Sequence, residues 1–213
     1  CTTDLDSAKD TAGANDPNVH GVLSVIHGDG AQYKTSLPLV DGTMLAVRAT
    51  WDPEVPARYT GERPTFMLAR GSLGAGNFLD AQGTKSWMQI SSVVVEVVLP
   101  GGYSEDQAST GTFDYRGTGS QRAFGEAIRW AGGLRADVDG KTIQDIVPDA
   151  SRNLGLVCTS AGVNLGFGAL AQDPMGLSFV KWVVAWEGPY TDQYLDVELM
   201  SYEFETNPTY EPG

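Results

Sequence analysis

The sequence predicts an α/β fold in which a mainly parallel sheet follows an antiparallel start. Five valines crowd the run ISSVVVEVVLPGG at residues 90–102, which is bounded by Pro-Gly-Gly and is typical of a buried strand. The apolar run LGLV at 154–157 passes through small residues into an apolar stretch that ends near Asp173, which predicts a strand, a sharp turn and a helix. Strands therefore alternate with helices from residue 90 onward, and this alternation indicates βαβ units.

The part of the chain before residue 90 predicts strands joined by short turns. Asp41-Gly42 is a hairpin signal, and Pro53 stops the strand that follows it. A polar loop at 56–64 then leads to an apolar strand that runs into the glycine-rich segment GSLGAG. The segments expected to contain these strands are 19–28, 33–41, 43–53 and 65–76.

The second half of the chain supplies the predicted helices. Residues 121–134 predict one helix, and residues 136–150 predict a turn followed by a short helix. A final strand is expected at 179–186, where it ends at Glu187-Gly188-Pro189. Between the valine-rich strand and the first helix, 103–112 is expected to be a surface excursion and 113–120 a loop.

Length and composition fit one domain of ordinary size. Of the 213 residues 41% are hydrophobic, which is enough for a substantial core. We divide the chain into a polar tether at 1–18, a core at 19–190 and an irregular tail at 191–213. The 14 basic and 27 acidic side chains give a net charge of -13, which argues against nucleic acid or an anionic membrane surface as a partner. The sequence contains no run of about 18 apolar residues, the length that a membrane-spanning helix needs.

The sequence opens with Cys1 and a polar segment, and in this it resembles a mature bacterial lipoprotein, whose signal peptide is cut before a lipid-modified cysteine. Lipid on Cys1 would anchor the protein to a membrane, so we expect an exported protein at the bacterial cell envelope or surface. The alternative is a processing end that leaves a cysteine. Cys158 is expected at the end of a buried strand, so a structural disulfide with Cys1 is not predicted.

Four motifs, in order along about residues 19–190, resemble the α/β-hydrolase family. GERPTFMLARGSLGAGNF resembles the third strand and oxyanion loop, and VVVEVVLPGG with FDYRGTGS resembles the fourth strand and its D-x-R-G-x-G loop. LVCTSAGVNLGFGALA resembles the nucleophile elbow, and FVKWVVAWEGP resembles the sixth strand. Two positions depart from the family pattern. Cys158 replaces the first glycine of the elbow, and Arg70 stands where a histidine often precedes Gly71.

The resemblance implies a serine hydrolase that acts on a small ester or a peptide-like amide. Ser160 would be the nucleophile, and the backbone N–H of Ala161 would stabilise the oxyanion, with a second donor from Gly71 or Ser72. No cofactor is implied, and the sequence shows no metal-ligand spacing of Cys or His. A nucleophile elbow requires strained backbone angles at Ser160 and an Oγ exposed to a pocket, whereas a structural serine would be buried or bonded to local backbone.

The sequence does not complete the catalytic triad of this family. Both histidines, His20 and His27, precede Ser160, whereas the family order is serine, acid, histidine. Each is expected to be a strand or turn histidine. Candidate acids after the serine include Asp173, Glu187, Asp192 and Asp196, and the alternative for each is a solvated loop carboxylate. Glu187 and Asp192 follow the last predicted strand, and Asp192 is the predicted catalytic acid.

The resemblance also implies that further strands should follow residue 190, and the tail does not supply them. Three explanations stay open. In the first, a second polypeptide completes the sheet and carries the histidine. In the second, the recorded sequence is part of a longer protein. In the third, the fold serves as a non-catalytic binding or assembly module of a surface lipoprotein. An unpaired apolar sheet edge is an aggregation hazard, which favours the first two explanations.

Three further patterns are interpreted structurally. The sequence Asp137-Val138-Asp139-Gly140 suggests a calcium loop, but Arg135 and Ile146 stand where an EF-hand needs oxygen ligands, so a local turn is predicted. GSLGAG is not a phosphate loop, because no Gly-Lys-Ser/Thr follows it. Trp182 and Trp186 share one face of a predicted strand, which favours core or groove packing.

Overall fold

The structure is a computed structural model that describes residues 20–26, 30–58, 61–71, 75–76, 78–79, 81–104 and 107–188. Several sequence predictions lie outside these residues and stay predictions. They concern the tether at 1–18 with its lipidation site, the tail at 191–213, one histidine, one oxyanion donor and the catalytic acid: Cys1, His27, Ser72 and Asp192.

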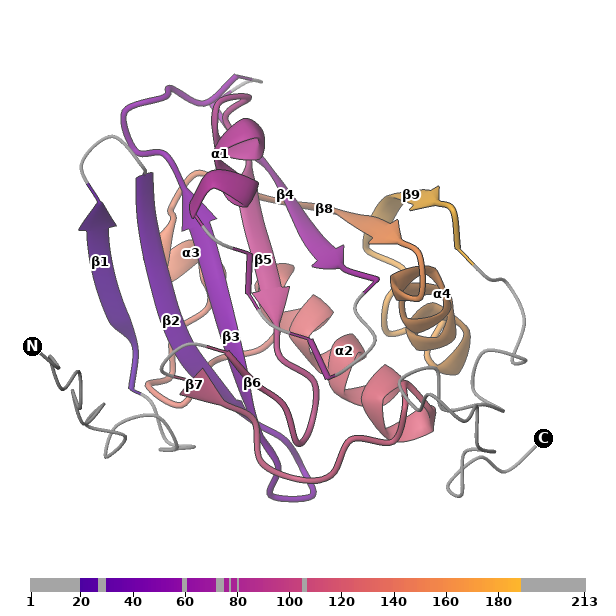
Figure 1. Cartoon of the computed structure of the whole chain (residues 1–213). Coiled ribbons are helices and arrows are strands. Elements are labelled where there is room, and N and C mark those ends of the chain that lie inside the picture. Colours follow the sequence, from indigo (N-terminus) through magenta and orange to yellow (C-terminus); the bar gives the residue numbers. More distant parts are fainter. Residues whose placement is uncertain are drawn as a thin grey trace, which may run out of the picture.

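A seven-stranded mixed sheet forms the centre of the molecule (Figure 1). Its spatial order is β1-β2-β3-β5-β4-β8-β9. The first three strands pair antiparallel with one another and β3 pairs antiparallel with β5, whereas β4 lies parallel to β5 and β8, and β8 parallel to β9. The bounds are β1 (Val22–Ile26), β2 (Gly30–Pro38), β3 (Met44–Trp51), β4 (Arg63–Ala69), β5 (Val93–Val97), β8 (Ala150–Thr159) and β9 (Val180–Trp186). The predicted α/β class with an antiparallel start is therefore confirmed.

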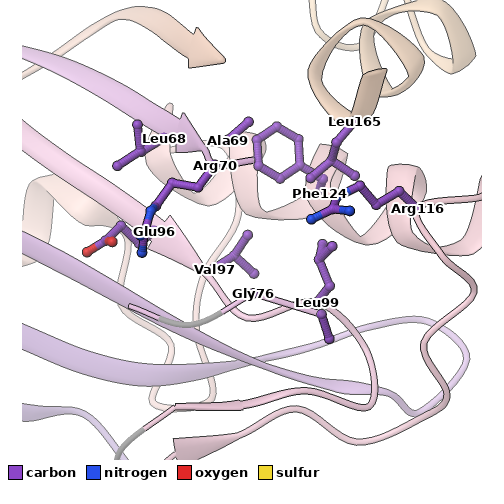
Figure 2. Close-up of a pocket in the computed structure, with 11 residues that line it drawn as sticks. Leu68, Ala69, Arg70, Gly76, Glu96, Val97, Leu99, Arg116, Phe124 and Leu165 are labelled. Carbon is purple, nitrogen blue, oxygen red and sulfur yellow. The ribbon is translucent and has the colours of Figure 1, made fainter. Parts of the chain in front are cut away.

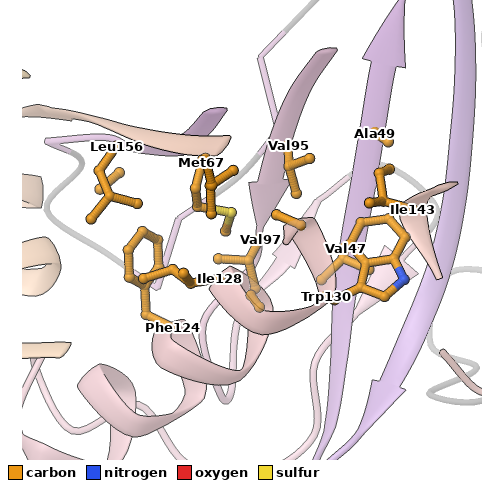
Figure 3. Close-up of a cluster of buried hydrophobic side chains, with 14 of the residues drawn as sticks. Val47, Ala49, Met67, Val95, Val97, Phe124, Ile128, Trp130, Ile143 and Leu156 are labelled. Atoms are coloured by element: carbon orange, nitrogen blue, oxygen red, sulfur yellow. The ribbon is translucent and has the colours of Figure 1, made fainter. Parts of the chain in front are cut away.

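Helices cover the two faces of the sheet unequally (Figure 1). Three of them, α2 (Thr118–Ala131), α3 (Ile143–Ile146) and α4 (Gly162–Gln172), pack into the main apolar core on one face. The fourth, α1 (Ala81–Met88), lies on the other face, where Trp87 packs against a smaller apolar cluster. The main core joins side chains of α2 to those of the sheet, as Figure 3 shows for Phe124, Ile128, Trp130, Met67, Val95 and Val97.

Two segments differ from expectation. Helix α1 was not predicted, because its sequence AQGTKSWM is mostly polar and contains a glycine. The segment 103–112 contains a short ribbon, β6 (Tyr103–Ser104) and β7 (Gln107–Ala108), and is not a free excursion. Ser109 Oγ accepts a hydrogen bond from Ala46 N at 2.8 Å and donates to Val98 O at 2.6 Å, so a polar side chain ties this segment to the sheet.

Strand β9 also differs from expectation. Within the described sheet it pairs only with β8, and it exposes a row of apolar side chains on one face. Trp182 is 40%, Val184 48% and Trp186 64% exposed, so the prediction of core or groove packing is wrong for Trp186. On this face α1 packs mainly against β3 and β5, and its Trp87 contacts Phe66, which in turn lies against Trp182. No helix in the described part of the chain is long and apolar enough to cross a membrane.

Candidate active site

Ser160 occupies the corner where β8 ends and α4 begins. Its φ is +51°, a left-handed conformation that costs a non-glycine residue about 1–3 kcal/mol, and its side chain is exposed. Hydrogen bonds hold the corner on both sides: Ser160 N donates to Trp186 O at 2.8 Å, and Val163 N donates to Ser160 O at 2.9 Å. The corner therefore has the backbone strain that a nucleophile elbow requires, and its serine is exposed.

Small residues allow this corner to be tight. A Cβ added to Gly162 would lie 2.1 Å from Ala69 O, so the start of α4 touches the backbone at the end of β4. Cys158, which stands where the family pattern has glycine, is fully buried and faces Gly166, where an added Cβ would lie 2.5 Å from its Sγ. Burial raises the pKa of the Cys158 thiol to about 12. Cys158 is thus a free, inert packing residue behind Ser160.

The loop after β4 approaches the serine directly. A Cβ added to Gly71 would lie 2.2 Å from Ser160 Cβ and 2.8 Å from its Oγ, so only glycine fits there without displacing the serine. Gly71 N donates to Thr159 Oγ1 at 3.3 Å and is directed at that hydroxyl. Ala161, the other predicted oxyanion donor, is buried at the N-cap of α4. Its N–H belongs to the helix end at which the macrodipole is positive.

The described acids lie at different distances from the serine along the fold. Glu187 follows Trp186 and precedes Gly188, where an added Cβ would lie 2.8 Å from Ser160 O, so Glu187 adjoins the corner. It is exposed and has a φ of +50°. Asp173 instead follows the last turn of α4, where it forms an ion pair with Arg129 and accepts a hydrogen bond from Gly176 N.

His20 lies far from Ser160 in the fold. It precedes β1, which is the first strand of the sheet, whereas Ser160 follows β8 near the opposite edge (Figure 1). Its Nδ1 lies 2.6 Å from Asp139 Oδ1, and this contact, before that with Gly21 N, holds the pKa of Asp139 below its usual range. We predicted a strand or turn histidine, whereas His20 lies just before β1, outside both a strand and a turn.

The predicted turn at 137–140 is held by the protein's own donors. Asp137 Oδ1 accepts hydrogen bonds from the backbone N–H groups of Asp139 and Lys141 at 2.9 and 2.8 Å. Its Oδ2 accepts from the hydroxyl of Tyr33 at 2.7 Å. Burial, with this hydrogen bond, raises the pKa of Tyr33 well above its usual value. No group of three metal-ligating side chains occurs among the described residues.

A small pocket opens at the carboxyl ends of β4 and β5, beside the elbow (Figure 2). Ligands of open α/β sheets bind at this end of parallel strands. Ser160 does not line this pocket, so the expected exposure of its Oγ to a pocket is not met here; Arg70, the residue before Gly71, does line it. Apolar side chains form most of its wall and three charged ones enter it: Leu68, Val97, Leu99, Phe124, Leu165, Arg70, Glu96 and Arg116.

Sequence reasoning missed two features of this region. Thr159, next to the predicted nucleophile, accepts the N–H of Gly71. Glu96 and Arg48 form a buried ion pair, with Nη2 and Oε2 2.6 Å apart. A signal for the pair was present, because a glutamate within VVVEVV and an arginine within LAVRATW interrupt two otherwise apolar strands.

Solved structures place this architecture among the α/β-hydrolases. No family model and no curated protein matches the sequence. In structure the chain is similar to brefeldin A esterase, a bacterial homologue of human hormone-sensitive lipase, at 15% identity and a TM-score of 0.52, over 73% of this chain and 39% of that one. It is also similar to a hypothetical protein from Pseudomonas aeruginosa, at 13% identity and a TM-score of 0.55, over 87% and 55%.

A third similar structure is a CocE/NonD family hydrolase from Staphylococcus aureus, at 18% identity and a TM-score of 0.54, over 79% of this chain and 29% of that one. The chain thus spans between 29% and 55% of the length of these three proteins. Together with the strand order, these likenesses show that the chain has the α/β-hydrolase fold.

Proposed function

We propose that this protein is a serine hydrolase of the α/β type that transfers the acyl group of a small ester or peptide-like amide to water. The observation that carries the proposal is the conformation of Ser160, which is exposed at a φ of +51° between β8 and α4. The close approach of Gly71 to the serine Oγ supports it, since this is the position of an oxyanion loop. The similar esterases and hydrolases are consistent with the same chemistry.

In the proposed reaction Ser160 Oγ attacks the substrate carbonyl carbon while a general base removes the hydroxyl proton. The N–H of Ala161, at the positive end of α4, stabilises the oxyanion, and a donor of this kind contributes roughly 3 kcal/mol. The proton then passes to the leaving alcohol or amine, and water hydrolyses the acyl-enzyme. For Gly71 to be the second donor, its N–H must turn from Thr159 Oγ1 toward the substrate.

We propose that the general base is a histidine on a polypeptide segment outside these 213 residues. The sequence contains two histidines, and one of them, His20, contacts Asp139 near β1, at the edge of the sheet opposite β9. The exposed apolar row on β9, formed by Trp182, Val184 and Trp186, supports an additional segment that packs beside this strand. Glu187 adjoins the corner and is the described candidate for the acid, with Asp192 as the sequence-based one.

The deciding experiment is fluorophosphonate labelling of the native protein together with its intact mass, measured denatured and unreduced. We expect label on Ser160 and a second, histidine-bearing segment in the native protein. Ser160→Ala should abolish labelling, whereas Ser178→Ala, which removes another exposed serine hydroxyl, should leave it unchanged. A native protein that carries no label would contradict the hydrolase proposal and favour the non-catalytic binding module.

A further inference from the structure

We infer that Glu96 is a positioning residue for the loop between β4 and α1: it binds Leu79 near the end of the loop and faces Arg70 at its start, next to the backbone that lies against Ser160. The catalytic consequence of this inference rests on the proposed function. Its structural part, the restraint of the loop, can be tested separately.

Glu96 is a buried carboxylate with an equally buried partner. Its side chain is 3% exposed and that of Arg48 is 1% exposed. The two residues are direct neighbours across β3 and β5. Arg48 donates to Glu96 Oε2 from Nε at 3.1 Å and from Nη2 at 2.6 Å. Two charges at this depth are costly to desolvate unless each is paired and hydrogen-bonded.

The same pair binds the end of the loop. Glu96 Oε1 accepts a hydrogen bond from Leu79 N at 2.8 Å, and Arg48 Nη2 donates to Leu79 O. The Arg48 guanidinium also lies over the ring of Phe78, 4.7 Å from its centre. Both backbone polar groups of Leu79 are therefore held by one ion pair. An apolar pair at 48 and 96 could not hold them.

The start of the loop faces the same carboxylate. Figure 2 shows the side chains of Arg70 and Glu96, which both line the pocket, pointing toward each other. Gly71, the next residue, carries the backbone that lies against Ser160. Glu96 thus lies between the first residue of the loop and Leu79 near its end, a position from which its carboxylate restrains the loop.

The first test compares the native protein with Glu96→Gln and with the double variant Arg48→Met/Glu96→Leu. Glu96→Gln keeps an oxygen for Leu79 N but leaves Arg48 without its counter-charge. The double variant replaces the pair with apolar side chains of similar size, an exchange that is often neutral for stability. It nevertheless removes both loop contacts, so it separates loop positioning from folding.

We expect amide hydrogen exchange of residues 71–79 to accelerate at least about tenfold in the double variant, because the restraint on Leu79 is lost. The fluorophosphonate rate constant should fall at least about tenfold, while the thermal midpoint stays within a few degrees of wild type. In Glu96→Gln the same labelling loss should accompany a lower thermal midpoint, since Arg48 is left buried and uncompensated.

The matched control is the pair Arg63–Asp149 at the other end of β4. Arg63 is 5% exposed, its Nε lies 2.7 Å from Asp149 Oδ2, and its Nη1 donates to the backbone oxygen of Asp52 at 2.8 Å. This control pairs a buried arginine with a partly exposed carboxylate and a backbone oxygen at the end of β4 away from the serine. Arg63→Met/Asp149→Leu should change neither the exchange of residues 71–79 nor the labelling rate.

The two proposals fail in different ways. If residues 71–79 exchange at the wild-type rate in both Glu96 variants, Glu96 does not position the loop, whatever the labelling result. If exchange accelerates but the wild-type native protein takes up no fluorophosphonate, the loop restraint is supported and the serine hydrolase proposal is wrong. Equal loss of labelling in the Arg63 control would overturn a specific role for Glu96.

Discussion

The backbone of Ser160 is strained, and this strain should be visible in stability. At a φ of +51° any residue with a Cβ is disfavoured, so Ser160→Gly should be about 1 kcal/mol more stable to unfolding than Ser160→Ala. Urea titration of both variants measures the difference. At Ser178, which does not have a positive φ, the same pair of substitutions should show no advantage for glycine. Equal stability of the two Ser160 variants would show that the corner relaxes without cost.

Gly162 tests the close packing behind the serine. In Gly162→Ala the new methyl group would meet Ala69 O at 2.1 Å, a backbone atom that cannot move aside cheaply. We expect a loss of at least about 2 kcal/mol in the free energy of unfolding. Gly125→Ala is the control, because the added Cβ finds only Leu177 Cδ1 at 3.7 Å and removes a glycine from the interior of α2. That substitution should be neutral or stabilising.

Cys158 makes stability depend on pH in the alkaline range. Burial raises its folded-state pKa from 9.0 to about 12, so the folded protein keeps the proton that the unfolded chain releases. Its contribution is therefore fully present below about pH 9 and is lost as the pH rises toward 12. The unfolding free energy of wild type minus that of Cys158→Ala should fall over this interval. A difference that stays flat would mean that the thiol is not desolvated.

At the scale of elements, the sequence pattern predicted those strands and turns whose conformation depends on neighbouring residues in the chain. Strand β5 and the second half of β8 contain apolar runs ended by small or turn-forming residues, and the corner at Ser160 follows from a strand that meets a small-residue helix. Helix α1 has no such pattern. Its position depends on Met88, which is 2% exposed and fits where Gly30 leaves room, with an added Cβ 2.8 Å from its Sδ. Such a contact joins residues far apart in the chain.

The residues of the candidate site likewise fall into two groups: those that local motifs identify and those that only the assembled sheet brings together. Ser160 and Gly71 could be assigned because each lies in a motif whose conformation is set by its neighbours. Arg48 and Glu96 are 48 residues apart and meet only because β3 pairs with β5 in one register. A sequence shows that each strand contains a charge, but the register that joins the two charges depends on the assembled sheet.

Helix α2 depends on a side chain that precedes it. Asp114 accepts hydrogen bonds from Gly119 N at 2.8 Å and from Ser120 N at 3.2 Å, and also from Ser120 Oγ. Its carboxylate therefore satisfies backbone donors in the first turn of α2. Asp114→Ala should lower the unfolding free energy by about 1 kcal/mol in urea titration. Asp41→Ala, whose carboxylate accepts hydrogen bonds from Thr43 in an exposed turn, should cost clearly less.

At the scale of the whole molecule, the described sheet has two edges with different neighbours. Strand β1 forms one edge of the described sheet, where His20 and Gly21 contact Asp139. Strand β9 forms the other, and the elbow lies beside it because Ser160 N is bonded to Trp186 O. The proposed histidine must reach Ser160, so a segment that packs beside β9 would arrive at the correct edge of the sheet.

This arrangement predicts that one tryptophan serves both assembly and activity. In Trp186→Arg the exposed apolar row on β9 gains a charge that a packed segment would have to desolvate, so the second segment should be lost from the native protein during purification. Fluorophosphonate labelling should fall with it, because the base would leave as well. Intact mass and labelling of the same sample measure both effects.

The control for Trp186→Arg is Leu23→Arg on β1, where an apolar side chain is 58% exposed at the opposite edge. It adds the same charge to a comparable surface and should leave segment retention and labelling at wild-type levels. If both variants behave alike, general surface charge explains the effect and β9 is not the assembly edge. If Trp186→Arg loses labelling but retains the second segment, Trp186 acts on the adjacent serine corner through Ser160 N, and the assembly role of β9 is wrong.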